Sequence, residues 1–163
     1  MKNSAVQTVS FVFGTVIAVA AQDLWPTFAG VKPPFVIAAV LFTAYHAPFT
    51  MALAMAFVAG LFIDALAGLP ALCATSLLPL LAIGAHFLHA RLGGRPSAAT
   101  GACATLLAAI LGEVWLAMCG IDAAETGLPI RICAAAAIAT PIGALTFALL
   151  PPLGRVAGIG GTE

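Results

Sequence analysis

The sequence predicts an all-α fold, a single polytopic membrane bundle of six transmembrane helices within residues 1–163. Three observations lead to this prediction. The chain is 63% hydrophobic and only 7% charged, whereas soluble domains carry about 25% charged residues. Its apolar residues form runs close to the 17 to 25 residues or so that cross a bilayer as a helix. Prolines, glycines and polar residues separate these runs, so each predicted helix has defined ends.

Charge and cysteine content exclude several classes of protein. Six basic and six acidic residues give a formal net charge of zero, and a chain without a basic run is not expected to bind nucleic acid. The cysteines lie in apolar runs without the spacing of a zinc site, which favours small core side chains over metal ligands or a disulfide framework. We therefore expect neither a metal nor a cofactor. The four cysteines are Cys73, Cys103, Cys119 and Cys133.

The first predicted span covers residues 5–24. Lys2 and the small residues at 18–20 resemble a signal peptide with its cleavage site. The apolar stretch nevertheless fills most of a bilayer, and Trp25 follows it as an interfacial anchor would. These features favour an uncleaved first helix over a removed signal.

Five further apolar runs follow, and the boundary after the second one decides the number of spans. A single helix over residues 34–67 would be about 50 Å long at 1.5 Å per residue, well beyond a hydrocarbon core of about 30 Å. Pro48, after the polar pair at 45–46, also favours a turn. We therefore predict six spans, with five as the alternative, and we expect the short second run to be tilted, kinked or sheltered by neighbours. The predicted runs are 34–47, 49–68, 70–90, 98–119 and 129–150.

Lysine and arginine in short loops predict the orientation of the bundle, because cytoplasmic loops carry the excess. An inside N-terminus and six spans place four basic residues in the cytoplasm and two outside, so both termini are predicted to be cytoplasmic. The inner residues are Lys2, Arg91, Arg95 and Arg155, and the outer ones are Lys32 and Arg131, beside Asp122 and Glu125.

Two carboxylates lie on stripes of small residues, near the predicted outer ends of the third and fifth spans. Asp64 and Glu113 each continue an i, i+4 series, in which successive residues share nearly one helix face. Small residues at this spacing allow helix backbones to approach closely in a membrane. The two stripes are Ala52, Ala56, Gly60, Asp64 and Gly68, and Gly101, Thr105, Ala109 and Glu113.

These carboxylates have two interpretations. Together they are candidates for an ion site, a proton relay or a pocket for a cationic ligand, because an intramembrane carboxylate is often functional. Alternatively, Asp64 accepts hydrogen bonds from backbone donors around residues 68–72, where the fourth helix begins, and Glu113 reaches the membrane interface beside Trp115. For Asp64 the structural interpretation is favoured.

We find no catalytic constellation. The sequence lacks the nucleophile, metalloprotease and phosphate-loop motifs. His46, His86 and His89 fall at the predicted inner ends of their spans, away from both carboxylates. They are interpreted as interfacial polar residues, with a three-histidine metal site as the weaker alternative.

Residues 60–70, GLFIDALAGLP, resemble a recognisable segment of the bacterial rod shape-determining protein MreD family. A glycine, an aspartate four residues on, a glycine four later and a short Pro/Leu/Gly turn mark that family. Here Gly60, Asp64, Gly68 and Pro70 match, whereas a turn glycine usual in the family is replaced near Leu72. The preceding run from Pro33 also resembles the family, and the rest of the chain matches it in length and hydropathy.

The resemblance implies a non-enzymatic scaffold of the cell-wall elongation machinery in the bacterial inner membrane. Its implied partners are an MreC-like bitopic protein and, directly or indirectly, the elongation polymerase and transpeptidase. The family's bundle is also similar to the substrate-binding subunits of energy-coupling-factor vitamin transporters. The alternative function is therefore a solute-binding transport subunit with Asp64 and Glu113 in its pocket, and an intramembrane enzyme is a third, weaker hypothesis.

Overall fold

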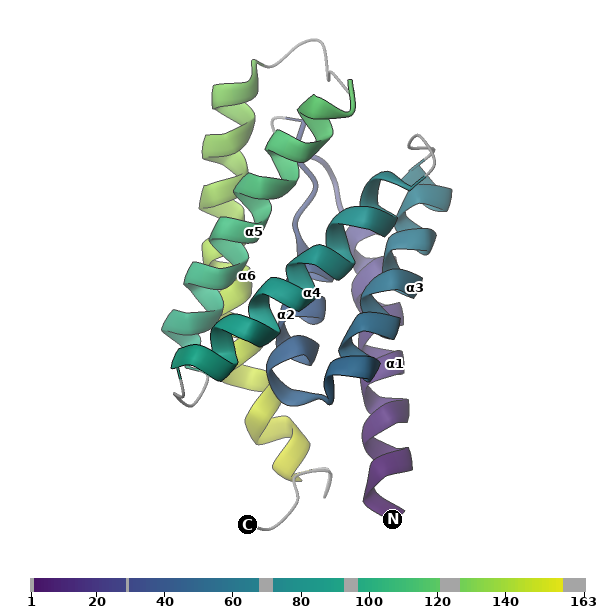
Figure 1. Cartoon of the computed structure of the whole chain (residues 1–163). Coiled ribbons are helices and arrows are strands. Elements are labelled where there is room, and N and C mark those ends of the chain that lie inside the picture. Colours follow the sequence, from purple (N-terminus) through teal and green to yellow (C-terminus); the bar gives the residue numbers. More distant parts are fainter. Residues whose placement is uncertain (1, 29, 68–71, 93–96, 121–126, 157–163) are drawn as a thin grey trace.

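A computed structural model describes residues 2–28, 30–67, 72–92, 97–120 and 127–156. Every named element in these ranges is helical, as predicted (Figure 1). Two of the four motif positions, Gly68 and Pro70, lie outside the described residues, as do Asp122 and Glu125. The helices are α1 (Lys2–Leu24), α2 (Phe35–His46), α3 (Phe49–Ala67), α4 (Cys73–Leu92), α5 (Ala98–Met118) and α6 (Leu128–Val156).

Four of these helices, α3 to α6, are long and apolar enough to cross a membrane. The apolar parts of α1 and α2, Thr8–Leu24 and Phe35–His46, are shorter. Residues 34–67 do not form one helix, because α2 ends at His46 and Ala47 adopts an extended conformation before Pro48. A proline sterically disfavours helical geometry in the residue before it. The prediction of six spans over five depended on a boundary between the second and third runs, and the structure has this boundary between α2 and α3.

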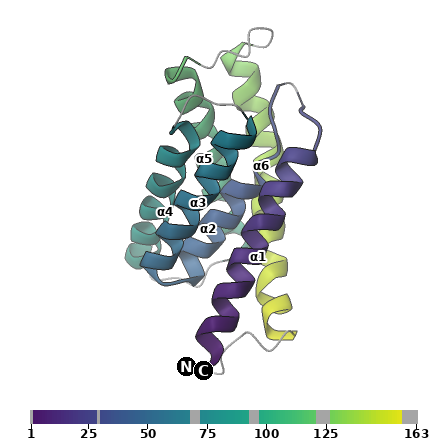
Figure 2. The same ribbon diagram turned by 90° about the vertical axis from the view of Figure 1, so that its right-hand side faces the viewer.

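The end of α6 differs from the sequence prediction. The last run was expected to end near residue 150, with a tail after Pro151, whereas α6 continues through Pro151 to Val156. Proline lacks an N–H donor and disturbs the turn before it, yet this helix also passes through Pro141. The N-terminal end of α1 and the C-terminal end of α6 lie at the same end of the bundle (Figures 1 and 2).

Helix α2 forms the centre of the bundle and contacts every other helix. Its 12 residues are about 18 Å long, too short to cross a bilayer alone. The helix is buried along most of its length, including Val36, Val40 and Leu41. The surrounding helices thus shelter the short second run, which needs no lipid-facing surface of its own.

Figure 2 shows the connection between α1 and α2 at the edge of the bundle, and part of it packs against the neighbouring helices. Val31 is buried against Ala109 of α5 and Ala135 of α6. The backbone N–H and C=O groups of Phe28 and Val31 pair with each other at 2.9 Å, and Gln22 Oε1 accepts from the N–H of Val36 at 3.1 Å. Irregular backbone at membrane depth requires such internal partners.

Candidate functional site

Asp64 caps the start of α4 from the neighbouring helix. The backbone N–H groups of Ala74 and Thr75 donate to its two carboxylate oxygens at 2.7 and 2.9 Å. The Thr75 hydroxyl donates a third hydrogen bond at 2.6 Å. Ala74 and Thr75 follow Cys73, the first residue of α4, so they carry N–H groups that have no partner within the helix. A carboxylate at this end is also favoured by the helix dipole.

Gly60 makes this cap possible because it allows α3 and α4 to touch through their backbones. A Cβ atom on Gly60 would lie 2.5 Å from Thr75 Cα and 2.8 Å from the carbonyl oxygen of Ala74. Real Cβ atoms are not found so close to backbone atoms. Asp64 is one helical turn further along the same face of α3. The spacing Gly60–Asp64 therefore combines close helix contact with a cap one turn later.

Leu72, the residue before α4, has a positive φ of 75°. This left-handed conformation is costly for a side chain with a Cβ atom and suits glycine. It occurs near the position where the family resemblance leads us to expect a turn glycine. Leu72 also has no acceptor in its side chain, so the usual capping position of α4 is occupied by a residue that cannot cap. Asp64 supplies the missing acceptor.

We expect Leu72→Gly to stabilise the protein by about 1 kcal/mol, because it removes the left-handed strain. Leu72 is 60% exposed, so little packing is lost. Thermal unfolding in detergent would measure the change. Leu80→Gly is the control, since Leu80 is similarly exposed at 56% but lies within α4, where glycine is destabilising. A fall in stability for both variants would contradict the prediction.

For Glu113 the sequence left two interpretations open, a functional carboxylate and a residue that reaches the membrane interface, and in the structure its partner is Arg131. Arg131 Nη2 of α6 lies 2.6 Å from Glu113 Oε2 of α5, and both side chains are less than 10% exposed. The two atoms are close but do not meet hydrogen-bond geometry, and Arg131 Nε has no hydrogen-bond partner in the described structure. The contact is therefore a buried ion pair, in which the two opposite charges neutralise each other.

From the sequence, Arg131 counted only among the basic residues on the outer side, at the start of the sixth run, and had no predicted partner. It lies in the first turns of α6 and is 6% exposed. The signal that could have identified its role is the general requirement that a charge inside a membrane bundle has a partner. The sequence did not indicate which carboxylate that partner would be.

Among the described contacts, Asp64 and Glu113 have different partners and do not form one site. Asp64 joins α3 to α4, and Glu113 joins α5 to α6. The described cavity near this end has a volume of about 30 Å³, room for roughly one water. It lies between α1 and α3, and neither carboxylate lines it.

The described residues of both small-residue stripes are buried inside the bundle. On α3 the buried residues include Ala52, Ala56 and Gly60. On α5 they include Gly101, Thr105 and Ala109. A Cβ atom on Gly101 would lie 2.6 Å from the carbonyl oxygen of Gly143 in α6, so this pair of helices also touches through backbone. The stripes therefore hold helix pairs together and are not open to a partner protein.

The three histidines lie at the opposite end, on the last turns of α2 and α4. The Nδ1 atoms of His46 and His86 hydrogen-bond with the carbonyl oxygens of Phe42 and Ala44 at 2.9 and 3.2 Å. The His89 ring packs against Tyr45. Within the described residues, no group of three potential ligands is placed to hold a metal. The histidines are thus separated from both carboxylates, as the spans predicted.

The four cysteines do not share one environment. Cys73 is 4% exposed, whereas Cys103, Cys119 and Cys133 are exposed. The sequence-based interpretation of all four cysteines as core side chains therefore holds for Cys73 and is wrong for the other three, which lie on the surface of the bundle.

The fold and these contacts define a class of protein. It is an all-helical bundle with membrane-spanning dimensions, in which two buried acidic residues each join a pair of helices. Comparison with known proteins gives no closer assignment. No family model matches the chain, and neither a curated protein nor a solved structure matches it.

Proposed function

We propose that the protein is a non-catalytic membrane scaffold of the bacterial cell-wall elongation machinery, which maintains rod shape with an MreC-like partner. The observation that carries the proposal is the Gly60–Asp64 segment, which resembles the MreD family. In the structure this segment is a packing and capping device between two helices, a role that suits a scaffold. Both carboxylate oxygens of Asp64 already accept hydrogen bonds from residues at the start of α4.

The proposed location is the inner membrane, with six spans and both termini in the cytoplasm. Four helices have spanning length, and the proposal adds α1 and the sheltered α2. The proposed partners are the MreC-like bitopic protein and, directly or indirectly, the elongation polymerase and transpeptidase. Because the described residues of both small-residue stripes are buried, contact with a partner helix would fall on the exposed apolar faces, such as Phe13 on α1 or Phe57 on α3.

This topology predicts the result of reporter fusions. A fusion after Gly94 is expected to be cytoplasmic, because it follows α4 next to Arg91 and Arg95. A fusion near Asp122 is expected to be periplasmic, because it follows the next span. Paired alkaline phosphatase and fluorescent reporters at each position provide the measurement and its internal control. A periplasmic signal after Gly94 would refute the orientation.

The alternative function is a solute-binding transport subunit. It needs a polar pocket that contains Asp64, whereas the three described bonds to Asp64 come from α4 itself. These bonds support the scaffold as the better proposal, because a carboxylate engaged by helix donors is occupied before any solute arrives.

Substitution of Asp64 distinguishes the two functions. We expect Asp64→Asn to be tolerated better than Asp64→Leu, because the amide oxygen still accepts hydrogen bonds and leucine cannot. The leucine variant leaves the two buried donors of Thr75 and the part-buried N–H of Ala74 without a partner, at a cost of about 3 kcal/mol. Rod shape and protein level would be measured in cells that carry each variant. Equal and complete loss of function in both variants, at normal protein level, would favour a titrating or ligand-binding carboxylate.

Depletion of the protein tests the function directly. Rod cells are expected to become round as the protein is lost, and pull-down in mild detergent is expected to recover an MreC-like single-span protein. The control is re-expression of the wild-type chain at its normal level. Unchanged rods together with tight binding of a vitamin-like solute would overturn the scaffold in favour of transport.

A further inference from the structure

The cavity between α1 and α3 has one polar wall and one apolar wall. Among the described residues, the polar wall consists of Gln22, Asp23 and Lys32, and the apolar wall of Val19, Ile63, Leu66 and Ala67. Gln22 is fixed in place, because its Oε1 accepts from the N–H of Val36 at 3.1 Å. The cavity volume of about 30 Å³ is enough for roughly one water, and a compact ammonium group is of similar size.

The two charges at this cavity are opposite, and each keeps further capacity for hydrogen bonds. Lys32 Nζ lies 3.1 Å from Asp23 Oδ1, and the two side chains are 38% and 44% exposed. Among the described residues, Asp23 Oδ2 has no hydrogen-bond partner, and the only partner of Lys32 Nζ is Asp23. An ammonium group has three donors and a carboxylate accepts at both oxygens. The pair can therefore bind one further cation at Asp23 and one further anion at Lys32.

The surroundings of the cavity match the boundary between the acyl chains and the headgroups of a bilayer. It lies near the ends of α1 and α3, which finish at Leu24 and Ala67, where the apolar segments of both helices also finish. Leu24, Trp25 and Leu66 are 85%, 49% and 56% exposed beside the charged pair. Tryptophan is enriched at membrane interfaces, and exposed apolar side chains at this depth are available to acyl chains.

We propose that this cavity binds the headgroup of a phospholipid with a primary ammonium group, phosphatidylethanolamine. The ammonium enters the cavity and donates to Asp23 Oδ2, while the phosphate accepts from Lys32 Nζ. Phosphatidylglycerol, an anionic lipid, is attracted by Lys32 but repelled by Asp23. The trimethylammonium group of phosphatidylcholine is too large for the cavity and has no N–H to donate. The inference requires only a surrounding bilayer and is independent of the proposed scaffold function and of the orientation of the bundle.

The test measures lipid binding to the purified full-length protein in mild detergent by native mass spectrometry. Phosphatidylethanolamine, phosphatidylcholine and phosphatidylglycerol with identical acyl chains compete at equal concentration. We expect phosphatidylethanolamine to bind about tenfold more tightly than either competitor, a ratio that one additional hydrogen bond to a charged group supplies. Equal binding of phosphatidylethanolamine and phosphatidylcholine, or a preference for phosphatidylglycerol, would overturn the proposal without the use of any variant.

Variants separate the roles of the two charges. Asp23→Asn is expected to remove the preference for phosphatidylethanolamine over phosphatidylcholine, whereas Asp23→Glu, which keeps the carboxylate, is expected to retain it. Lys32→Gln is expected to weaken the binding of both lipids alike, because both carry the phosphate.

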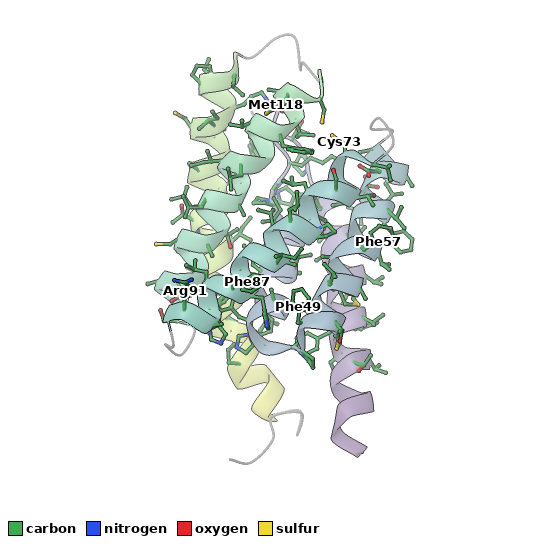
Figure 3. The ribbon with its side chains drawn as sticks, in the orientation of Figure 1. Phe49, Phe57, Cys73, Phe87, Arg91 and Met118 are labelled. Carbon is green, nitrogen blue, oxygen red and sulfur yellow. The ribbon has the colours of Figure 1, made fainter. Side chains whose placement is uncertain are left out.

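The matched control for the loss of a charge is Arg91→Gln. Arg91 is exposed, and Figure 3 shows it at the end of α4 opposite to Cys73, far from the cavity. This variant is expected to keep the wild-type preference. A preference that survives Asp23→Asn, or one that Arg91→Gln also abolishes, would contradict binding at the cavity.

Fluorescence quenching locates the lipid. Trp25 lies two residues after Asp23, and in nanodiscs it is expected to be quenched more by phosphatidylethanolamine with brominated acyl chains than by the same amount of brominated phosphatidylcholine. Trp25→Phe leaves Trp115, the other of the two tryptophans, and gives the background signal. Equal quenching of Trp25 by the two lipids would overturn the proposal. Neither readout depends on cell shape, so a failure of the scaffold function would appear only in the depletion experiment.

Discussion

Gly60→Ala is expected to destabilise the protein by about 3 kcal/mol, through overpacking and the loss of hydrogen bonds to Asp64. The added methyl group would meet backbone atoms of Thr75 and Ala74, which cannot move aside as a flexible side chain can. Separation of α3 from α4 would also draw Asp64 away from the N–H groups that it caps. Thermal unfolding in detergent and the amount of folded protein in membranes would measure the effect.

Two other glycines provide matched controls for Gly60. Gly14 on α1 and Gly84 on α4 have no atom within 4 Å of the position where a Cβ would lie. Alanine favours a helix over glycine by about 1 kcal/mol, so Gly14→Ala and Gly84→Ala are expected to be neutral or slightly stabilising. Similar losses at all three positions would show that the close contact at Gly60 is not the cause.

Removal of one partner of the Glu113–Arg131 pair is the second change with a large expected effect. Arg131→Met or Glu113→Leu leaves an uncompensated buried charge, which costs about 3 to 5 kcal/mol. The double variant, with leucine and methionine together, is expected to recover most of this loss, because apolar residues can replace a buried ion pair with little net change. Unfolding measurements on the two single variants and the double variant would give the coupling energy.

The exposed ion pair between Lys32 and Asp23 is expected to contribute much less to stability than the buried pair between Glu113 and Arg131. Lys32 Nζ and Asp23 Oδ1 are 3.1 Å apart, and their side chains are 38% and 44% exposed. Exposed pairs contribute about 0 to 1 kcal/mol, so Asp23→Asn is expected to change stability little. If Arg131→Met were equally mild, or if the double variant were no better than the single ones, the buried pair would not hold α5 to α6.

The class of fold and most helix boundaries were accessible from sequence because they depend on local properties. Apolar runs predicted the helices, and Pro48 marked the break between α2 and α3. The end of α6 was predicted too early, because Pro151 was interpreted as a helix breaker but lies within the helix. The shelter around α2 was one of three alternatives for the short second run, and only the packing of the other helices distinguished them.

The candidate site could be predicted in part. The i, i+4 series placed Asp64 on a packing face and favoured a structural role, but the donors shown by the structure are Ala74 and Thr75, beyond the expected segment. Nothing in the sequence indicated that Arg131 would enter the bundle and meet Glu113.

The sequence by itself determined the all-helical class, helices long and apolar enough to cross a membrane, most of the helix boundaries, and the small-residue stripes on two of the helices. Hydropathy, proline and small-residue spacing act within one helix or between chain neighbours, so they can be read along the chain. Only the tertiary structure decided which partner each buried polar group has. Asp64 and Thr75 come from different helices, and so do Glu113 and Arg131. Such pairs depend on the rotation and depth of whole helices, which packing sets once the bundle has assembled.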